Sequence, residues 1–229
     1  MGKPQVLFVL TSHNKLGSLD KPTGWYLPEL AHPYHVLHNK VDITVASPKG
    51  GEAPLDPSSV EAAKDDVSVN FLKNNEQVWK TTKKLSDFVG KADEFDAIFY
   101  VGGHGPMFDL ADDPTSQKII KEFWESNKIV SAVCHAPAVL YNVKLSDGSL
   151  LVAGKEVTGF TNAEEEQAGL TKAVPFLPED ALQKASGGKF VKAAEPWGEK
   201  VVVVGRLITG QNPASATGVG EAIAKALNV

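Results

Sequence analysis

Five short apolar runs, rich in β-branched side chains, recur along the 229-residue chain and constrain its fold more than any other feature. Each run is apolar almost throughout rather than alternating, which is typical of strands that are covered on both faces. Segments with helical spacing separate the runs. This alternation predicts an α/β fold built on a doubly wound parallel sheet. The predicted strands are residues 6–10, 41–46, 97–101, 129–133 and 201–204.

Two helices are predicted over residues 114–126 and 214–227, and Asp112 or Asp113 is available as the N-cap of the first. The chain length suits one elaborated domain over residues 1–229. Two stretches are too long for a minimal βαβ repeat, and we expect them to be insertions that decorate the sheet. They lie near residues 49–91, which turn helical from about 75 to 89, and 161–195.

Charge and cysteine content limit the partners and the compartment. The 23 basic and 28 acidic residues give a net charge of -5 without a block of like charges, so neither a nucleic acid nor a membrane is expected as a partner. The apolar start at residues 5–10 is too short for a signal peptide. With one cysteine, no intramolecular disulfide can form. These features predict a cytoplasmic protein, with the nucleus as the other location considered.

The strongest chemical signal is Cys134 followed by His135, at the end of the predicted strand 129–133 and the start of a helical pattern. In open α/β sheets, ligands bind beyond the carboxyl ends of the strands. A thiol on such a strand-to-helix turn is exposed for attack, and a helix start beside a histidine is expected to lower its pKa. The alternative is a buried structural cysteine, which is the commoner fate of a free thiol.

A second predicted strand ends on the same edge of the sheet in Gly102, Gly103 and His104, followed by another glycine. Glycines let backbone N–H groups approach a substrate closely, as an oxyanion hole requires. A phosphate cradle is the rival interpretation, but no Gly-Lys-Ser/Thr follows and the dinucleotide fingerprint lacks its third glycine. A plain tight turn is the remaining alternative.

Glu29 opens a predicted helix after Pro28, again beyond the carboxyl end of a strand. Its apolar neighbours would raise the pKa of its carboxyl by desolvation, whereas the helix N-terminus would lower it, and the sequence does not decide between them. A simple N-terminal helix glutamate is the alternative. His32, His35 and His38 cannot all converge from one helix, so no metal site is predicted there.

Longer motifs accompany these residues: Trp-Tyr-Leu-Pro-Glu-Leu at 25–30, Ser-Pro-Lys-Gly-Gly at 47–51 and Thr-Gly-Phe-Thr-Asn-Ala-Glu-Glu at 158–165. Together they resemble the DJ-1/PfpI superfamily, in its Hsp31-like branch of fungi and plants. The resemblance implies a flavodoxin-like sandwich, also described as class I glutamine amidotransferase-like, that usually forms a homodimer. It also implies a glutathione-independent glyoxalase (D-lactate dehydratase), a lyase that converts methylglyoxal to D-lactate without cofactor or metal.

Carried over from this resemblance, Cys134 is the nucleophile, Glu29 the acid/base and His135 the triad histidine. The acidic partner of His135 is expected within residues 162–167, with Glu166 favoured by spacing and Glu165 next. The substrate is expected to be a small 2-oxoaldehyde, and the resemblance also implies a stress-protective role. The other functions considered are a holdase chaperone for unfolded client proteins, a redox sensor and a cysteine hydrolase or deglycase.

Overall fold

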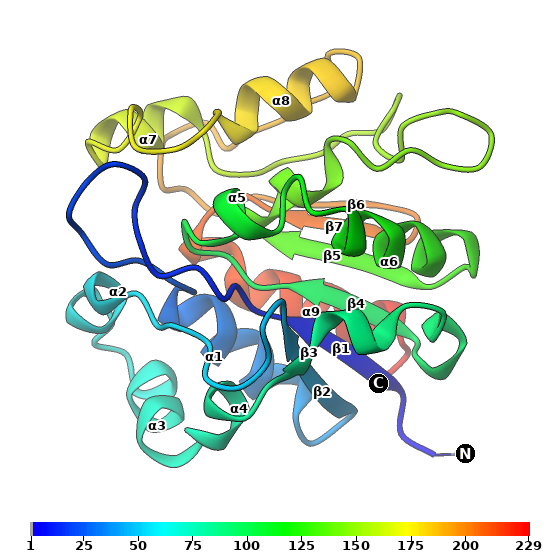
Figure 1. Cartoon of the computed structure of the whole chain (residues 1–229), viewed down its shortest axis with the longest axis horizontal. Helices are drawn as coiled ribbons and strands as arrows, with labels where there is room; N and C mark the ends of the chain where they lie inside the picture. The colour runs from blue at the N-terminus through cyan, green and yellow to red at the C-terminus, as the bar shows by residue number, and fades with distance from the viewer. Residues whose placement is uncertain (1) are drawn as a thin grey trace.

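The protein, described here over residues 2–229 of a computed structural model, folds around one seven-stranded sheet (Figure 1). The strand order is β3-β2-β1-β4-β5-β7-β6, and every neighbouring pair is parallel except β6 with β7. The predicted α/β fold with a doubly wound sheet is therefore confirmed. The strands are β1 (Gln5–Val9), β2 (Asp42–Ser47), β3 (Lys83–Lys84), β4 (Ala97–Tyr100), β5 (Ile129–Val133), β6 (Val201–Val204) and β7 (Leu207–Gly210).

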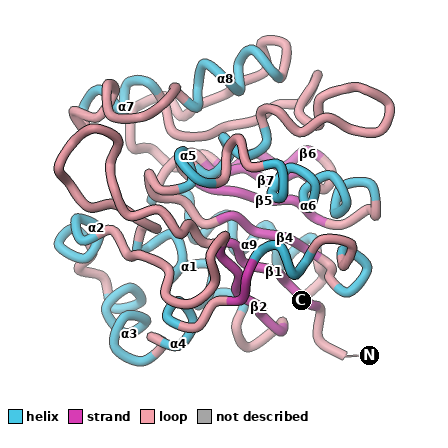
Figure 2. The backbone as a smooth tube through the Cα atoms, in the orientation of Figure 1, coloured by secondary structure: helices cyan, strands magenta, loops and turns pink. Residues whose placement is uncertain are grey.

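Helices cover both faces of the sheet (Figure 2). Alternate side chains of β1 enter two separate cores: Val6 and Phe8 belong to one, and Leu7 and Val9 to the other. Helices α1 and α9 close the first core, whereas α6 closes the second. The α-helices are α1 (Leu27–Leu37), α2 (Pro57–Ala62), α3 (Asp66–Asn74), α4 (Gln77–Lys80), α5 (Pro106–Asp109), α6 (Pro114–Glu125), α7 (Asn162–Gln167), α8 (Pro178–Ala185) and α9 (Ala216–Ala226).

Four short 3₁₀ helices complete the described elements: η1 (Leu85–Phe88), η2 (Ala92–Glu94), η3 (Ala136–Leu140) and η4 (Pro213–Ser215). The predicted strands and the two predicted helices are present to within two residues at each end, and Asp113 caps α6 through its side chain. The helix predicted over residues 75–89 is wrong. Only four residues form α4, because the chain then turns so that Thr82 pairs with Gly51 and the next two residues add β3 to the sheet.

The far edge of the sheet also differs from the prediction. The run 201–204 is an edge strand, antiparallel to β7, and Val203 is 54% exposed rather than covered on both faces. Gly205 makes the turn between the two strands with a φ of 59°. Strand β7 was not predicted, because only four residues form it, and two of them, Thr209 and Gly210, are polar or small. Four consecutive valines do not show whether a strand lies at the edge of the sheet with one face exposed or is buried on both faces.

The two predicted insertions lie at opposite ends of the molecule in Figure 1: the segment with α2, α3 and α4 at one end and that with α7 and α8 at the other. The carboxyl ends of β4 and β5 point into the space between them. The single-domain organisation stays a prediction. No helix within residues 2–229 combines the length and the apolar character that a membrane crossing needs.

Candidate active site

Cys134 occupies the turn that directly follows β5, and its backbone is strained. Its φ is +65°, a left-handed conformation that is uncommon for a residue with a side chain. Two backbone hydrogen bonds hold the turn: the Cys134 N–H donates to Gly210 and its carbonyl accepts from Phe160. Only 3% of the residue is exposed. The predicted placement on the turn after this strand is confirmed, but the expected exposure is wrong because the residue is buried, and the helix that follows is the short 3₁₀ helix η3.

His135 lies between the thiol and a buried carboxylate. Its Nδ1 is 3.4 Å from Cys134 Sγ, and its Nε2 is 2.5 Å from Glu165 Oε2. A second histidine, His104, donates to the other oxygen of Glu165 over 2.7 Å. An ionised Glu165 accepts from both rings, so the proton of neutral His135 is on Nε2. Its Nδ1 is then free to accept the thiol proton.

The charges of this group favour that proton arrangement. Burial opposes ionisation of Glu165, yet the positive charge that His135 gains on protonation and the hydrogen bonds from His104 and His135 hold the pKa of this carboxyl well below its usual range. Burial and then the charge of nearby His104 lower the pKa of His135. Together these effects describe a carboxylate beside a neutral imidazole, which is the resting state of a general base.

The carboxylate that contacts His135 is Glu165, which corrects the prediction of Glu166. A capping box at the start of α7 fixes the rotation of this helix, because Thr161 and Glu164 exchange side-chain-to-backbone hydrogen bonds. Glu165 then faces inward and is buried, whereas Glu166 is exposed. The Thr-x-x-Glu spacing of residues 161–164 is the signal in the sequence that indicates this rotation.

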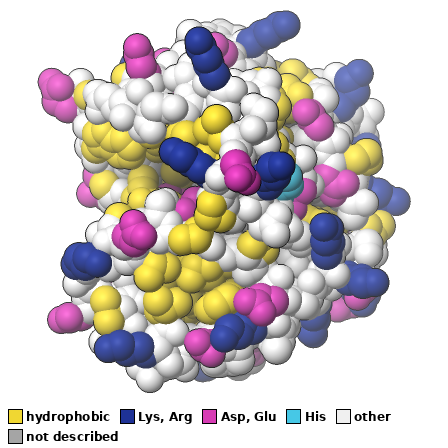
Figure 3. Space-filling model, turned by 60° about the vertical axis from the view of Figure 1, so that its left-hand side comes forward, with side chains coloured by type: hydrophobic (Ala, Val, Ile, Leu, Met, Phe, Trp, Pro, Cys, Tyr) yellow, Lys and Arg dark blue, Asp and Glu magenta, His cyan; other side chains and the backbone are white. Residues whose placement is uncertain are grey.

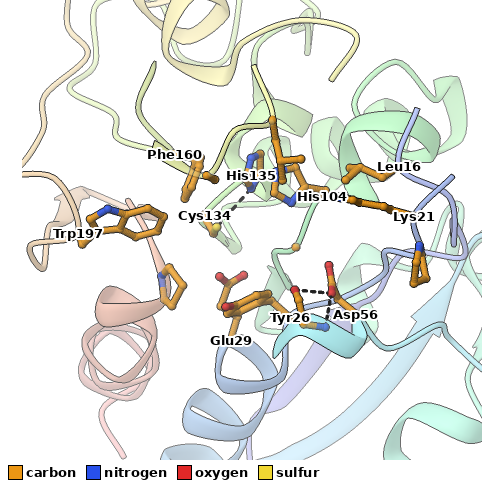
Figure 4. Close-up of a pocket in the computed structure, with 16 residues that line it drawn as sticks. Leu16, Lys21, Tyr26, Glu29, Asp56, His104, Cys134, His135, Phe160 and Trp197 are labelled. Atoms are coloured by element: carbon orange, nitrogen blue, oxygen red, sulfur yellow. Dashed lines mark hydrogen bonds between the residues drawn. The ribbon is translucent and has the colours of Figure 1, made fainter. Parts of the chain in front are cut away.

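Glu29 lies in the first turn of α1 and is completely buried. Neither of its carboxyl oxygens has a well-aligned hydrogen-bond partner among residues 2–229. Figure 4 shows its carboxyl pointing toward the sulfur of Cys134. Burial raises the pKa of this carboxyl well above its usual range, a contact with the Cys134 thiol opposes the rise, and the charge of Asp56 adds to it. Desolvation therefore outweighs the helix N-terminus, which answers the question that the sequence left open.

The glycine loop closes the site from the β4 side. A Cβ atom on Gly102 would lie 2.0 Å from Glu29 Oε2 and 2.8 Å from the Cβ of Cys134, so only glycine fits between the two reactive side chains. Gly103 has a φ of +107° and lines the pocket. The backbone N–H groups of Gly103 and His135 donate no hydrogen bond within the described residues, so both remain available for a substrate oxygen.

A cavity of about 320 Å³ opens onto these groups. Figure 3 shows apolar side chains gathered around a hollow on this face of the molecule. Three aromatic residues line the cavity that the sequence analysis did not assign to the site: Tyr26, Phe160 and Trp197. Phe160 stacks on the ring of His135 at 4.1 Å. Tyr26 and Phe160 belong to motifs noted in the sequence, but nothing there indicated that their rings face the thiol.

The model of the DJ-1/PfpI family matches residues 26–226. The chain belongs to this family. Among curated relatives, Glyoxalase 3 of Candida albicans is 31% identical over 95% of this chain and 95% of its own length. The glutathione-independent glyoxalase HSP31 of Saccharomyces cerevisiae is also 31% identical, over 94% of each chain.

Solved structures give the same relationship. Glyoxalase III from Candida albicans superposes with a TM-score of 0.87 at 31% identity and covers 97% of each chain. The 24 kDa rapid encystment protein of Francisella tularensis superposes with a TM-score of 0.91 at 39% identity and covers 98% of this chain and 99% of its own. The predicted flavodoxin-like DJ-1/PfpI fold and the likeness to the Hsp31-like branch are confirmed.

The thiol of this DJ-1/PfpI protein differs in one respect from the expectation. Burial, followed by the charge of Glu29, raises the pKa of Cys134 well above its usual range. The five-residue helix η3 is too short to provide the dipole on which a lowered pKa was predicted. The thiol therefore keeps its proton at rest, and a thiolate forms when a neighbouring base accepts that proton.

This environment predicts the pH dependence of alkylation. We expect the rate of Cys134 alkylation by iodoacetamide to rise with pH through a midpoint above the ordinary thiol pKa of about 8.5. Glu29→Gln should lower this midpoint, because it removes the negative charge that opposes the thiolate. Glu166→Gln, an exposed substitution, is the matched control and should leave it unchanged. A midpoint below 8.5 in the unmodified protein would mean that burial does not control the thiol.

Two histidines and one glutamate form a cluster with the residue types of a metal site. The ligand atoms of His104, His135 and Glu165 all lie within 4.8 Å of one another. Hydrogen bonds already join these atoms, which explains their convergence without an ion. His32, in contrast, bonds to Thr217 and pairs with Asp65 at 3.0 Å, so it serves contacts between helices.

Proposed function

We propose that this protein is a glutathione-independent glyoxalase that converts methylglyoxal and water to D-lactate. The observation that carries the proposal is the position of Cys134, with Nδ1 of His135 beside its sulfur and the unpartnered carboxyl of Glu29 pointing toward it. Several relatives of full-length similarity bear the name glutathione-independent glyoxalase or Glyoxalase 3, which supports the same activity.

The first step makes a carbon–sulfur bond. Nδ1 of His135 accepts the thiol proton while Sγ of Cys134 attacks the aldehyde carbon of methylglyoxal, and a hemithioacetal forms. The oxygen of the former aldehyde becomes negatively charged. The N–H groups of Gly103 and His135, which donate no hydrogen bond among the described residues, are the donors proposed to stabilise it. Gly102 leaves the space between Glu29 and Cys134, and the ring of His104 contacts Glu165.

The second step moves a proton between adjacent carbons. Glu29 acts as the base in its ionised form, which burial makes the less populated form at rest. This carboxylate removes the proton from the former aldehyde carbon, an enediol forms, and the same carboxyl returns the proton to the neighbouring carbon. The proton that His135 took from the thiol passes to the former ketone oxygen. The former aldehyde carbon is thereby oxidised to a thioester while the ketone carbon is reduced to an alcohol. Water then hydrolyses the thioester, releases lactate and returns the proton to the thiol. Atoms and electrons balance with one water consumed and no cofactor.

The decisive experiment is a D-lactate assay on the purified protein with methylglyoxal and without glutathione. We expect lactate formation to match methylglyoxal consumption, with the D enantiomer as the product. Consumption of methylglyoxal without release of lactate would contradict the proposal, because it would mean covalent capture of the aldehyde instead of turnover. The stress-protective role, the homodimer and the binding of unfolded clients stay predictions from the resemblance.

A pair of variants tests the assignment of the acidic partner. Glu165→Gln should lower kcat by about 10²-fold, the lower end of what a positioned general base contributes, because the tautomer of His135 is no longer fixed. Glu166→Gln, one residue further along the same helix and exposed, should keep kcat within twofold. Equal losses in the two variants would show that the carboxylate beside His135 has no special part in the reaction.

A further inference from the structure

Trp197 is a large apolar residue that is both exposed and strained. Its φ is +67° and 43% of its surface is accessible, although it lines the same cavity as Cys134. A bulky residue rarely adopts this backbone conformation, and it persists only where its surroundings impose it. An exposed apolar side chain at the mouth of a pocket is also a common feature of binding surfaces. Both observations call for an account of what the indole does.

Hydrogen bonds to two residues of α7 hold Trp197 in this position. Its backbone N–H donates to Glu164 Oε1 over 2.8 Å, and its indole N–H donates to Gln167 Oε1 over 2.7 Å. Glu164 is itself completely buried and accepts from the side chains of Gln211 and Asn212 at 2.9 and 2.8 Å. The loop that carries the indole is thus fixed to α7 and to the segment that follows β7. The position of Trp197 is set before any substrate binds.

The indole extends an aromatic wall that begins beside the thiol. Phe160 stacks on His135 at 4.1 Å, and Trp197 packs edge-on against Phe160 at 5.5 Å. In Figure 4 the three rings follow one another along one side of the pocket, with His135 at one end and Trp197 at the other. The wall thus runs from His135, whose Nδ1 is 3.4 Å from the sulfur, to an indole that is two ring contacts away.

We infer that the site accepts 2-oxoaldehydes whose ketone carries a large apolar group, above all an aryl group, and that Trp197 determines this preference. The inference rests on the proposed glyoxalase function and names its substrate class. A volume of about 320 Å³ is in the range of pockets for ligands much larger than methylglyoxal. Aromatic rings also gain from edge-to-face contact with an indole beyond the area that they bury.

The chemistry is the same for an aryl substrate. With phenylglyoxal, Cys134 adds to the aldehyde carbon, Glu29 moves the proton to the carbon that bears the phenyl ring, and water hydrolyses the thioester to mandelate. One water is consumed, the aldehyde carbon is oxidised and the ketone carbon is reduced. The reacting carbons keep the roles proposed for methylglyoxal, and the aryl group is the part proposed to contact Phe160 and Trp197.

The test compares kcat/KM for phenylglyoxal and methylglyoxal in three variants. We expect Trp197→Ala to lower the phenylglyoxal value at least tenfold, mainly through KM, and the methylglyoxal value less than threefold. Trp197→Phe should recover most of the phenylglyoxal value, because a smaller ring keeps the edge-to-face contact. Trp124→Phe on α6, outside the pocket, is the matched control and should change neither value.

The outcomes separate the inference from the proposed function. Equal losses for both substrates in Trp197→Ala, or no loss for either, would overturn the assignment of Trp197. Turnover of methylglyoxal without turnover of phenylglyoxal would overturn the substrate class and leave the glyoxalase proposal intact, whereas turnover of neither would contradict that proposal itself.

Phenylglyoxal also modifies arginine side chains, so the position of arginine matters for this test. The one arginine of the chain, Arg206, packs on Trp124 and precedes β7. It lies at the opposite end of this strand from Cys134.

Discussion

Cys134→Ala is expected to abolish methylglyoxal turnover, with a fall in kcat of more than about 10³-fold, since loss of a nucleophile removes the covalent route altogether. No other residue can replace the sulfur, because the chain has one cysteine. The fold should tolerate the change: alanine keeps the Cβ atom, and the two backbone hydrogen bonds of the elbow do not involve the side chain. The measurement is D-lactate release, with circular dichroism as the check on folding.

Cys134→Ser is the matched variant, because it differs from the native residue by one atom. A buried hydroxyl beside Glu29 loses its proton far less readily than a thiol, so this variant should be almost as inactive as the alanine variant. Lactate release by either variant at more than a hundredth of the native rate would remove the covalent step from the mechanism. If the protein acts instead as a holdase chaperone, both variants should suppress aggregation of unfolded proteins as well as the native protein does.

Glu29→Gln is expected to lower kcat by about 10³–10⁴-fold, at the upper end of what a positioned acid or base contributes. Glutamine preserves the shape of the side chain but cannot remove the proton from the hemithioacetal carbon. The thiol should still react, so hemithioacetal formation continues and the reaction stops before the enediol. Stopped-flow measurement of methylglyoxal uptake, alongside lactate release, distinguishes the two steps.

The control for Glu29→Gln is Glu52→Gln, an exposed glutamate outside the cavity, which should keep kcat within twofold. Incorporation of solvent deuterium at the alcohol carbon of lactate provides an independent readout in the native enzyme, because a carboxyl that exchanges with water delivers solvent protons. Near-native turnover in Glu29→Gln would leave the proton transfer to another group, and His135 would be the next residue to test.

Much of the fold could be predicted because buried parallel strands need continuous apolar runs. The strands β1, β4 and β5 are such runs, and the nucleophile follows the last of them. The short segments β3 and β7 could not be found in this way. Two lysines form the whole of β3, and its existence depends on pairing with β2 rather than on its own composition. Tertiary context decides such elements.

The residue types of the candidate site could be predicted from the sequence, but the directions in which its side chains point and their burial were not predicted. Cys134, His135 and Glu29 each follow from a strand end or a helix start, which are features of local sequence. The choice between Glu165 and Glu166 depends on the rotation of α7, and the pKa of Cys134 depends on how deeply the elbow is buried. The rotation of α7 is set locally by its capping box, whereas the depth of the elbow is a property of packing between segments far apart in the chain. Trp197 was missed for the same reason.

The carboxyl of Glu29, which has no well-aligned hydrogen-bond partner, couples ligand concentration to the conformational stability of the protein. A buried polar group without a hydrogen bond costs a folded protein about 1–3 kcal/mol. This cost falls at the proposed substrate site, and a bound molecule that donates a well-aligned hydrogen bond to Glu29 removes it. Any ligand that prefers the folded state raises the free energy of unfolding as its concentration rises. The protein should therefore resist unfolding and proteolysis best when such a ligand is abundant, and it should be degraded faster when that ligand is scarce.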